Sequence, residues 1–139
     1  TSVSRGLGDV YKRQPWSDLE CAGKSMKQNE ELDFLVQQET LLEWAKIYLN
    51  GADPRSPLAS TIHADLSELA PVLIQTGGAE MLLSDAVQLE KKLKSAGNQV
   101  RLEVWEDMTH NWQMFAPILD KGQEAIDQVG SFIRNQIPD

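Results

Sequence analysis

The chain has 139 residues, of which 41% are hydrophobic and 24% charged, and it carries a formal net charge of −8 with a sequence pI near 4.7. This length and composition are those of one globular domain, and no apolar run approaches the roughly 20 residues that would cross a bilayer. The acidic balance excludes nucleic acid as an expected partner, because phosphate binding needs a basic surface.

The first 14 residues differ in character from those that follow. Residues 1–14 (TSVSRGLGDVYKRQ) have neither helical nor strand periodicity and resemble the translated adapter sequence found at the broken ends of metagenomic reading frames. We therefore expect a non-native or disordered leader that makes few contacts, with the domain itself in residues 15–139. The alternative is an ordinary polar tail, and neither interpretation gives these residues a function.

The first regular elements after the leader are a helix and a buried strand. An apolar stripe predicts a helix at about 38–50, with Gly51 as the left-handed residue that ends it. A loop rich in turn-forming residues then extends to about Ala70. VLIQT at 72–76 is a short apolar run before two glycines, which is typical of a buried parallel strand.

A second unit of helix, strand and helix completes the chain. We expect Ser84 or Asp85 to cap a helix that ends near Gly97, followed by an alternating strand at 100–105. The last helix is expected to begin near Asp120 and to bury one side, formed by Ile126, Val129, Ile133 and Ile137. This order predicts an α/β fold with a parallel sheet, and two strands are too few to cover these helices, so more sheet is expected upstream.

Chemically useful side chains follow both predicted strands. Glu80 lies in the loop after the first strand and His110 in the loop after the second, at the edge where open parallel sheets place functional groups. A carboxylate and a histidine in that arrangement could form a general base and the acid that orients it. No serine stands in a G-x-S-x-G motif: around Ser25 the second glycine is replaced by Lys27.

Most of the chain resembles the C-terminal half of the hormone-sensitive-lipase-like family of α/β-hydrolases, above all its bacterial esterases and acetyl hydrolases. The resemblance covers residues 15 to about 137 and rests on the closing helix and on PWSDL (15–19), YLNGADPRSPLAS (48–60), PVLIQTGGAEMLLSDA (71–86) and VRLEVWEDMTHNW (100–112). It implies an incomplete sheet, consisting of the last two strands and their flanking helices. The family's nucleophilic serine and oxyanion loop would lie upstream of PWSDL.

The resemblance also implies roles for particular residues. His110 matches the catalytic histidine, although Asn111 and Trp112 follow it where the family commonly has Gly and Phe. Glu80 matches the first Asp of the family's Y-D-P-L-R-D stretch and is therefore our choice for the acid. Asp85 is the alternative acid, although a carboxylate in the first turn of a helix already has a structural explanation.

An apolar set near these loops could line a substrate pocket or could simply pack in the core; it consists of Met81, Trp112, Met114 and Phe115. Cys21 is the only cysteine, which favours a reducing, cytoplasmic location. The only other histidine is His63, which we expect at the surface, and neither a metal site nor a cofactor is predicted.

The expected function is therefore that of part of a carboxylic-ester hydrolase that uses a Ser-acid-His mechanism on a small-molecule ester. Without the nucleophile and the oxyanion loop, the chain alone is expected to be inactive. Two alternatives remain open: a small non-enzymatic α/β binding or interaction module, and a family member that has lost its activity. Extension of the reading frame upstream would distinguish them, because only the hydrolase should reveal a G-x-S-x-G motif.

Overall fold

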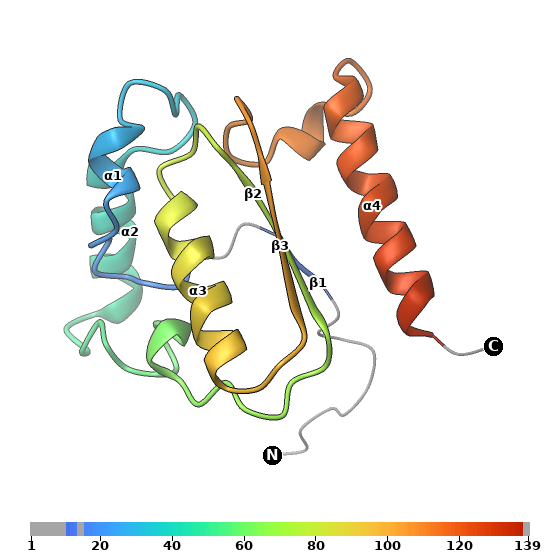
Figure 1. Cartoon of the computed structure of the whole chain (residues 1–139). Coiled ribbons are helices and arrows are strands. Elements are labelled where there is room, and N and C mark those ends of the chain that lie inside the picture. The colour runs from blue at the N-terminus through green and yellow to red at the C-terminus, as the bar shows by residue number, and fades with distance from the viewer. Residues whose placement is uncertain (1–10, 14–15, 138–139) are drawn as a thin grey trace.

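The computed structural model describes residues 11–13 and 16–137, which build one parallel sheet with helices on both faces (Figure 1). The strands are β1 (Tyr11–Arg13), β2 (Val72–Gly77) and β3 (Val100–Trp105), in that order across the sheet. β2 pairs with β3 along its whole length, from Val72 opposite Val100 to Gly77 opposite Trp105. The predicted α/β class and both predicted strands are confirmed.

β1 is a third strand, which the sequence pattern did not predict. Its three residues pair in parallel with β2, with Tyr11 opposite Leu73 and Arg13 opposite Gln75. The expectation that residues 1–14 make few contacts is therefore wrong for residues 11–13, whereas residues 1–10 and 14 lie outside the described residues. Backbone pairing explains the difference, because the open edge of β2 offers N–H and C=O groups that can pair with almost any extended segment, whatever its side-chain pattern.

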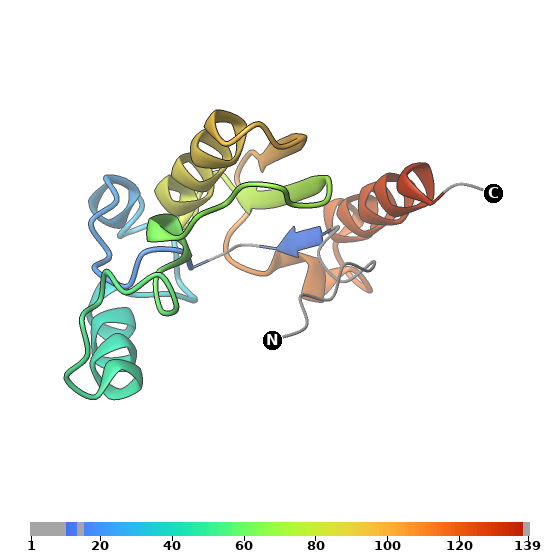
Figure 2. The ribbon, with the colours of Figure 1, turned by 90° about the horizontal axis from the view of Figure 1, so that it is seen from below.

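Alternation along β2 divides its side chains between two helix layers. Val72 and Ile74 pack against helix α3 (Leu83–Ser95), in a core cluster completed by Ala86, Leu89 and Leu93. Gln75 points to the other face, where its Nε2 donates to the carbonyl of Ala125 in helix α4 (Asp120–Gln136) at 2.9 Å. Figure 2 accordingly shows α3 and α4 on opposite faces of the sheet.

The buried side of α4 differs from the expected stripe. Gly122 and Ala125 are buried, whereas Ile126 and Ile137 are 43% and 47% exposed. A Cβ at Gly122 would lie 2.9 Å from the backbone of Ala116, so small residues allow α4 to approach the chain just after the 3₁₀-helix η2 (Trp112–Phe115). The closest packing of α4 is therefore set by its smallest residues, which a search for large apolar side chains does not find.

A second layer of short elements covers the α3 side of the sheet. It contains α1 (Ser25–Gln28), α2 (Gln38–Leu49) and the 3₁₀-helix η1 (Thr61–His63), which lie far from α4 in both Figure 1 and Figure 2. The predicted helix at 38–50 is confirmed, and both Asn50 (φ 44°) and Gly51 (φ 88°) adopt positive φ at its end. This layer packs against the loop after β2 and the start of α3 through a second core cluster, formed by Cys21, Met26, Leu41, Met81 and Leu82.

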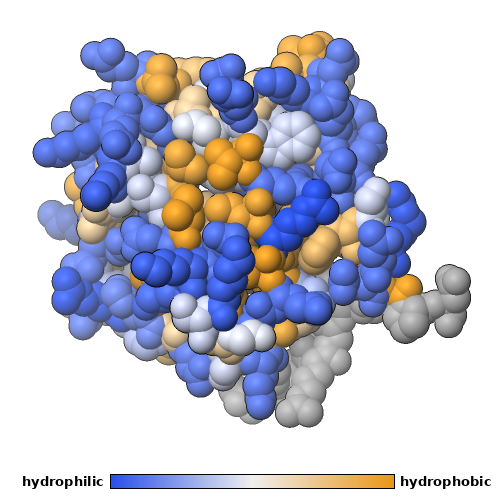
Figure 3. Space-filling view, in the orientation of Figure 1, coloured by the Kyte–Doolittle hydropathy of each residue, from blue (hydrophilic) through white to orange (hydrophobic). Residues whose placement is uncertain are grey.

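The face of the molecule on which the β3 edge of the sheet lies carries apolar groups near its middle (Figure 3). Val87 of α3 and Val104 of β3 are 43% and 51% exposed. β3 is an edge strand of the described sheet, so its outer backbone groups have no strand partner among the described residues. None of the helices in the described part of the chain is long and apolar enough to span a bilayer.

Candidate active site

The loops that follow β2 and β3 are joined to each other through their backbones. Gly78 N–H donates to the Trp105 carbonyl at 2.8 Å, and Ala79 N–H donates to the Met108 carbonyl at 3.0 Å. A Cβ at Gly77 would lie only 2.0 Å from the Met108 carbonyl oxygen, so the approach requires glycine at this position. The two loops therefore hold their side chains at one site, at the carboxyl edge of the sheet.

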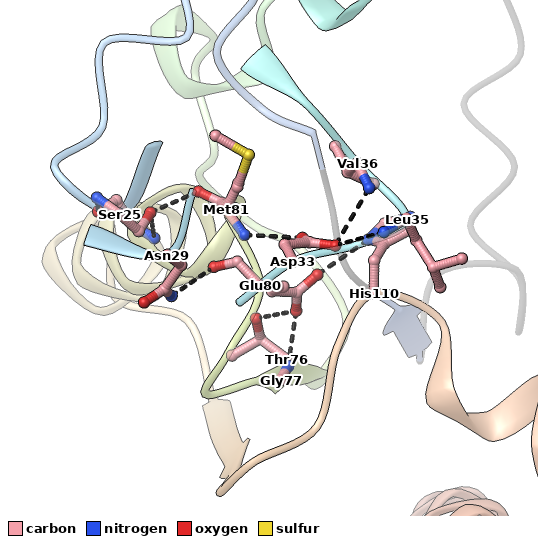
Figure 4. Close-up of polar contacts among 11 residues, drawn as sticks. Ser25, Asn29, Asp33, Leu35, Val36, Thr76, Gly77, Glu80, Met81 and His110 are labelled. Atoms are coloured by element: carbon pink, nitrogen blue, oxygen red, sulfur yellow. Dashed lines mark hydrogen bonds and ion pairs between the residues drawn. The ribbon is translucent and has the colours of Figure 1, made fainter. Parts of the chain in front are cut away.

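Glu80 and His110 meet at this site (Figure 4). His110 Nδ1 lies 2.9 Å from Glu80 Oε2, and the side chains are 19% and 0% exposed, respectively. An ionised carboxylate can only accept, so Nδ1 is the nitrogen that donates to it, and in a neutral imidazole with this tautomer Nε2 has the free lone pair. The arrangement orients an imidazole so that Nε2 can act as a base.

The second oxygen of Glu80 is held by the end of β2. Oε1 accepts from the Thr76 hydroxyl and from Gly77 N–H at 2.6 Å, and Thr76 itself is fully buried. With Oε1 engaged in this way, Oε2 is the oxygen presented to the imidazole. The contribution of Thr76 was missed from the sequence, because a threonine at the end of a buried strand is an ordinary strand residue.

The backbone on both sides of His110 includes left-handed conformations. Asp107 (φ 61°) and Asn111 (φ 58°) both have positive φ, which Asp and Asn tolerate better than most residues. Asp107 therefore acts as a turn-forming residue. Asn111 stands where the family that the sequence resembles commonly has glycine, and it adopts this left-handed conformation next to an imidazole that still contacts Glu80.

Asp85, the alternative acid, serves a different part of the molecule. Its Oδ2 accepts from the backbone N–H groups of Ser17 and Asp18, at 2.9 Å each, and so anchors the PWSDL segment to α3. The expected capping role is wrong for both candidates, since the N-cap residue of α3 is Leu82 and no side chain makes a capping hydrogen bond. Ser84 instead accepts from Ser25 N–H at 3.0 Å.

Burial raises the pKa of Asp85 from 3.8 to about 6, against the lowering effect of the Ser17 and Asp18 N–H groups. Oδ1 of this carboxylate is buried and has no hydrogen-bond partner among the described residues. Between about pH 4 and pH 6, Asp85 is therefore mostly protonated in the folded chain and mostly ionised in the unfolded chain. Ionisation of Asp85 above that window should lower the free energy of unfolding by about 3 kcal/mol.

The Asp85→Asn variant tests this expectation. Asn keeps an oxygen acceptor but cannot ionise, so we expect the variant to gain up to about 3 kcal/mol relative to the wild type between about pH 4 and about pH 7.5. Urea unfolding of both proteins at the two pH values gives the difference in their free energies of unfolding. The pH-dependent contributions of the other carboxylates are the same in both proteins and cancel. An equal pH response of the two proteins would contradict a raised pKa at Asp85.

The four residues expected near a pocket are not gathered in one apolar patch. Met81 belongs to the core cluster with Met26 and Leu82, and Trp112 packs against Trp105 with ring centroids 5.8 Å apart. Both are 1% exposed, as core residues are, whereas Met114 is 61% exposed and Phe115 is half-buried. Core packing thus describes Met81 and Trp112, and a pocket-lining role stays a prediction for Met114 and Phe115.

One group of potential metal ligands occurs among the described residues away from these loops. Asp18, Glu20 and His63 place one ligand atom each within 4.8 Å of one another. Two of them already have protein partners: Asp18 Oδ1 accepts from Glu20 N–H at 3.0 Å, and Glu20 Oε2 pairs with Arg55 Nε at 2.8 Å. His63 is exposed, as expected. Contacts within the chain therefore already engage Asp18, which is buried, and Glu20.

Comparison with known proteins identifies the chain. Residues 10–114 match the model of a family described as the alpha/beta hydrolase fold. The chain belongs to the α/β-hydrolase family. The predicted resemblance to the hormone-sensitive-lipase-like branch is confirmed by a crystal structure of an esterase from the bacterial hormone-sensitive lipase family, with 45% identity and a TM-score of 0.89, covering 93% of this chain and 44% of that one.

Two curated relatives of this α/β-hydrolase carry similar names. An acetyl-hydrolase of Streptomyces hygroscopicus is 42% identical over 86% of the chain, and an esterase of Acinetobacter venetianus is 30% identical over 85%. The chain spans only about 40% of the length of either relative. A hormone-sensitive lipase from a metagenome library, 33% identical with a TM-score of 0.87, has the same fold over 92% of this chain and 45% of its own.

Proposed function

We propose that the chain is the acid-and-histidine part of a serine carboxylic-ester hydrolase acting on a small-molecule ester. The observation that carries the proposal is the 2.9 Å contact between His110 Nδ1 and the buried Glu80 carboxylate at the carboxyl edge of the sheet. The names of the relatives, an acetyl-hydrolase and an esterase, support the same reaction class. Because Asp85 binds Ser17 and Asp18 whereas Glu80 contacts the imidazole, Glu80 is the acid of the proposed triad.

In the proposed mechanism the serine nucleophile comes from residues upstream of this chain. His110 Nε2 takes the serine Oγ proton as Oγ attacks the ester carbonyl, and Glu80 stabilises the imidazolium that forms. The tetrahedral intermediate collapses as Nε2–H gives its proton to the departing alkoxide, which leaves as the alcohol. Water then repeats the sequence on the acyl-serine: Nε2 accepts a water proton and returns it to serine Oγ, releasing the acid.

The proposal makes this chain inactive when it stands alone. Ser25, whose surroundings came closest to a nucleophile motif, is 1% exposed and donates to the Met81 carbonyl at 2.5 Å, so its hydroxyl is engaged in packing the loop. We call the chain together with its upstream residues the full-length parent. We propose in addition that the protein is cytoplasmic and needs no cofactor. We also propose that residues 1–14 are of artefactual origin.

The test compares four proteins. The isolated chain and its His110→Ala variant should hydrolyse a short-chain p-nitrophenyl ester at the same background rate, whereas the full-length parent should turn it over and its His110→Ala variant should not. A rate in the isolated chain that depends on His110 would contradict the proposal that this chain lacks the nucleophile. A full-length parent without a G-x-S-x-G serine would instead favour the non-enzymatic module or a hydrolase that has lost its activity.

A further inference from the structure

The peptide unit that follows Glu80 is held by side chains from a distant segment. Asn29 Nδ2 donates to the Glu80 carbonyl at 2.8 Å and to the Gly78 carbonyl at 3.1 Å. Asp33 Oδ2 accepts from Met81 N–H at 2.9 Å. The Glu80 carbonyl and the Met81 N–H belong to one planar peptide group and point in opposite directions, so Asn29 and Asp33 bind its two ends.

Both side chains are themselves fixed. Asn29 and Asp33 are 8% and 1% exposed, and Asp33 N–H donates to the Asn29 carbonyl at 2.9 Å. The other oxygen of Asp33, Oδ1, accepts from Leu35 N–H and Val36 N–H at 3.1 Å each. One buried carboxylate thus joins the segment after α1 to the loop that carries Glu80 (Figure 4).

The spacing of these residues in the sequence explains how one segment reaches the loop repeatedly. Ser25, Asn29 and Asp33 are four residues apart, beginning in α1 and continuing through the turn after it. Their side chains contact successive backbone groups of the Glu80 loop, since Ser25 donates to the Met81 carbonyl at 2.5 Å. The segment therefore lies along the loop and contacts it through three polar side chains.

We propose that Asn29 and Asp33 are positioning residues for the acid, because they fix the 80–81 peptide plane from both sides and so direct the Glu80 carboxylate at His110. This inference rests on the proposed function. Glu80 is held at two points: Thr76 and Gly77 bind Oε1, whereas Asn29 and Asp33 set the backbone from which the side chain departs. A glutamate has one more rotatable bond than an aspartate, so a fixed backbone reduces the positions its carboxylate can take.

The experiment uses isosteric changes in the full-length parent. Asn29→Asp keeps the shape but removes both donors, and Asp33→Asn keeps the shape but cannot accept from all three N–H groups. We expect each change to lower kcat by about 10- to 100-fold with KM within about 2-fold, because an orienting group displaced by a fraction of an ångström affects the transition state more than binding. We also expect the low-field proton resonance of His110 Nδ1–H to shift or broaden.

The matched control is Asp85→Asn, which alters another fully buried carboxylate that accepts from two backbone N–H groups. It should leave kcat and the His110 resonance unchanged. If Asn29→Asp and Asp33→Asn only lower the melting temperature, with kcat per folded enzyme and the resonance unchanged, the two residues are structural and the inference is wrong.

Two further measurements keep the outcomes separate. Glu80→Gln with an undiminished kcat would overturn the proposed function, whereas a crippled Glu80→Gln beside fully active Asn29→Asp and Asp33→Asn would overturn this inference alone. If neither variant folds, hydrogen exchange on the wild-type parent decides. Met81 N–H should exchange as slowly as the N–H groups of β2. Exchange at the rate of an open loop would contradict the proposal that Asn29 and Asp33 fix the 80–81 peptide.

Discussion

Glu80→Gln in the full-length parent should lower kcat by about 10⁴-fold while leaving the protein folded. Gln keeps an oxygen for Thr76 and Gly77, but its amide NH₂ then faces His110 Nδ1. The imidazole must present its lone pair to that donor, so Nε2 carries the proton and cannot take one from a nucleophile. Steady-state kinetics on a short-chain p-nitrophenyl ester, with circular dichroism to verify folding, measures the effect.

Two companion variants make the result specific. Glu80→Asp retains a carboxylate but is one methylene shorter, so it should retain more activity than Glu80→Gln. Asp85→Asn should leave kcat within about 2-fold of the wild type, because Asp85 binds Ser17 and Asp18 rather than the imidazole. A reversed outcome, with Asp85→Asn inactive and Glu80→Gln active, would show that the acid has been assigned to the wrong residue.

Gly77→Ala should be the most disruptive single change at the junction of the two loops. The added Cβ would lie 2.0 Å from the Met108 carbonyl oxygen and 2.6 Å from its carbon, and backbone cannot move aside as the end of a flexible side chain can. We expect the free energy of unfolding to fall by about 3 kcal/mol. Because the displaced residue is two positions before His110, kcat per folded molecule should fall as well.

The neighbouring glycine is the control for this change. A Cβ at Gly78 would meet Glu106 and Trp105 backbone atoms no closer than 3.4 Å, so Gly78→Ala should change the free energy of unfolding by no more than about 1 kcal/mol. Urea unfolding of both variants of the full-length parent gives the comparison. Equal stabilities for Gly77→Ala and Gly78→Ala would mean that the β2 and β3 loops do not approach each other as closely as the structure places them.

The sequence alone predicted the elements whose patterns are local. The apolar run at 72–76, the alternation at 100–105 and the helical stripe after Gln38 each determine their own conformation, and β2, β3 and α2 lie where these patterns place them. The choice of Glu80 and His110 also came from the sequence, because both follow parallel strands and match a family motif. The third strand could not be predicted, since β1 depends on a free edge of β2 rather than on a pattern of its own.

The tertiary structure decided how the candidate site is assembled. It brought Glu80 within 2.9 Å of His110, assigned Asp85 to the PWSDL segment, and showed Thr76, Asn29 and Asp33 around the acid. None of these contacts has a local signature in the sequence, because each joins side chains to backbone groups whose positions depend on how separate segments pack. A periodic pattern determines the conformation of one segment, whereas hydrogen bonds between segments depend on distances that only the folded chain sets.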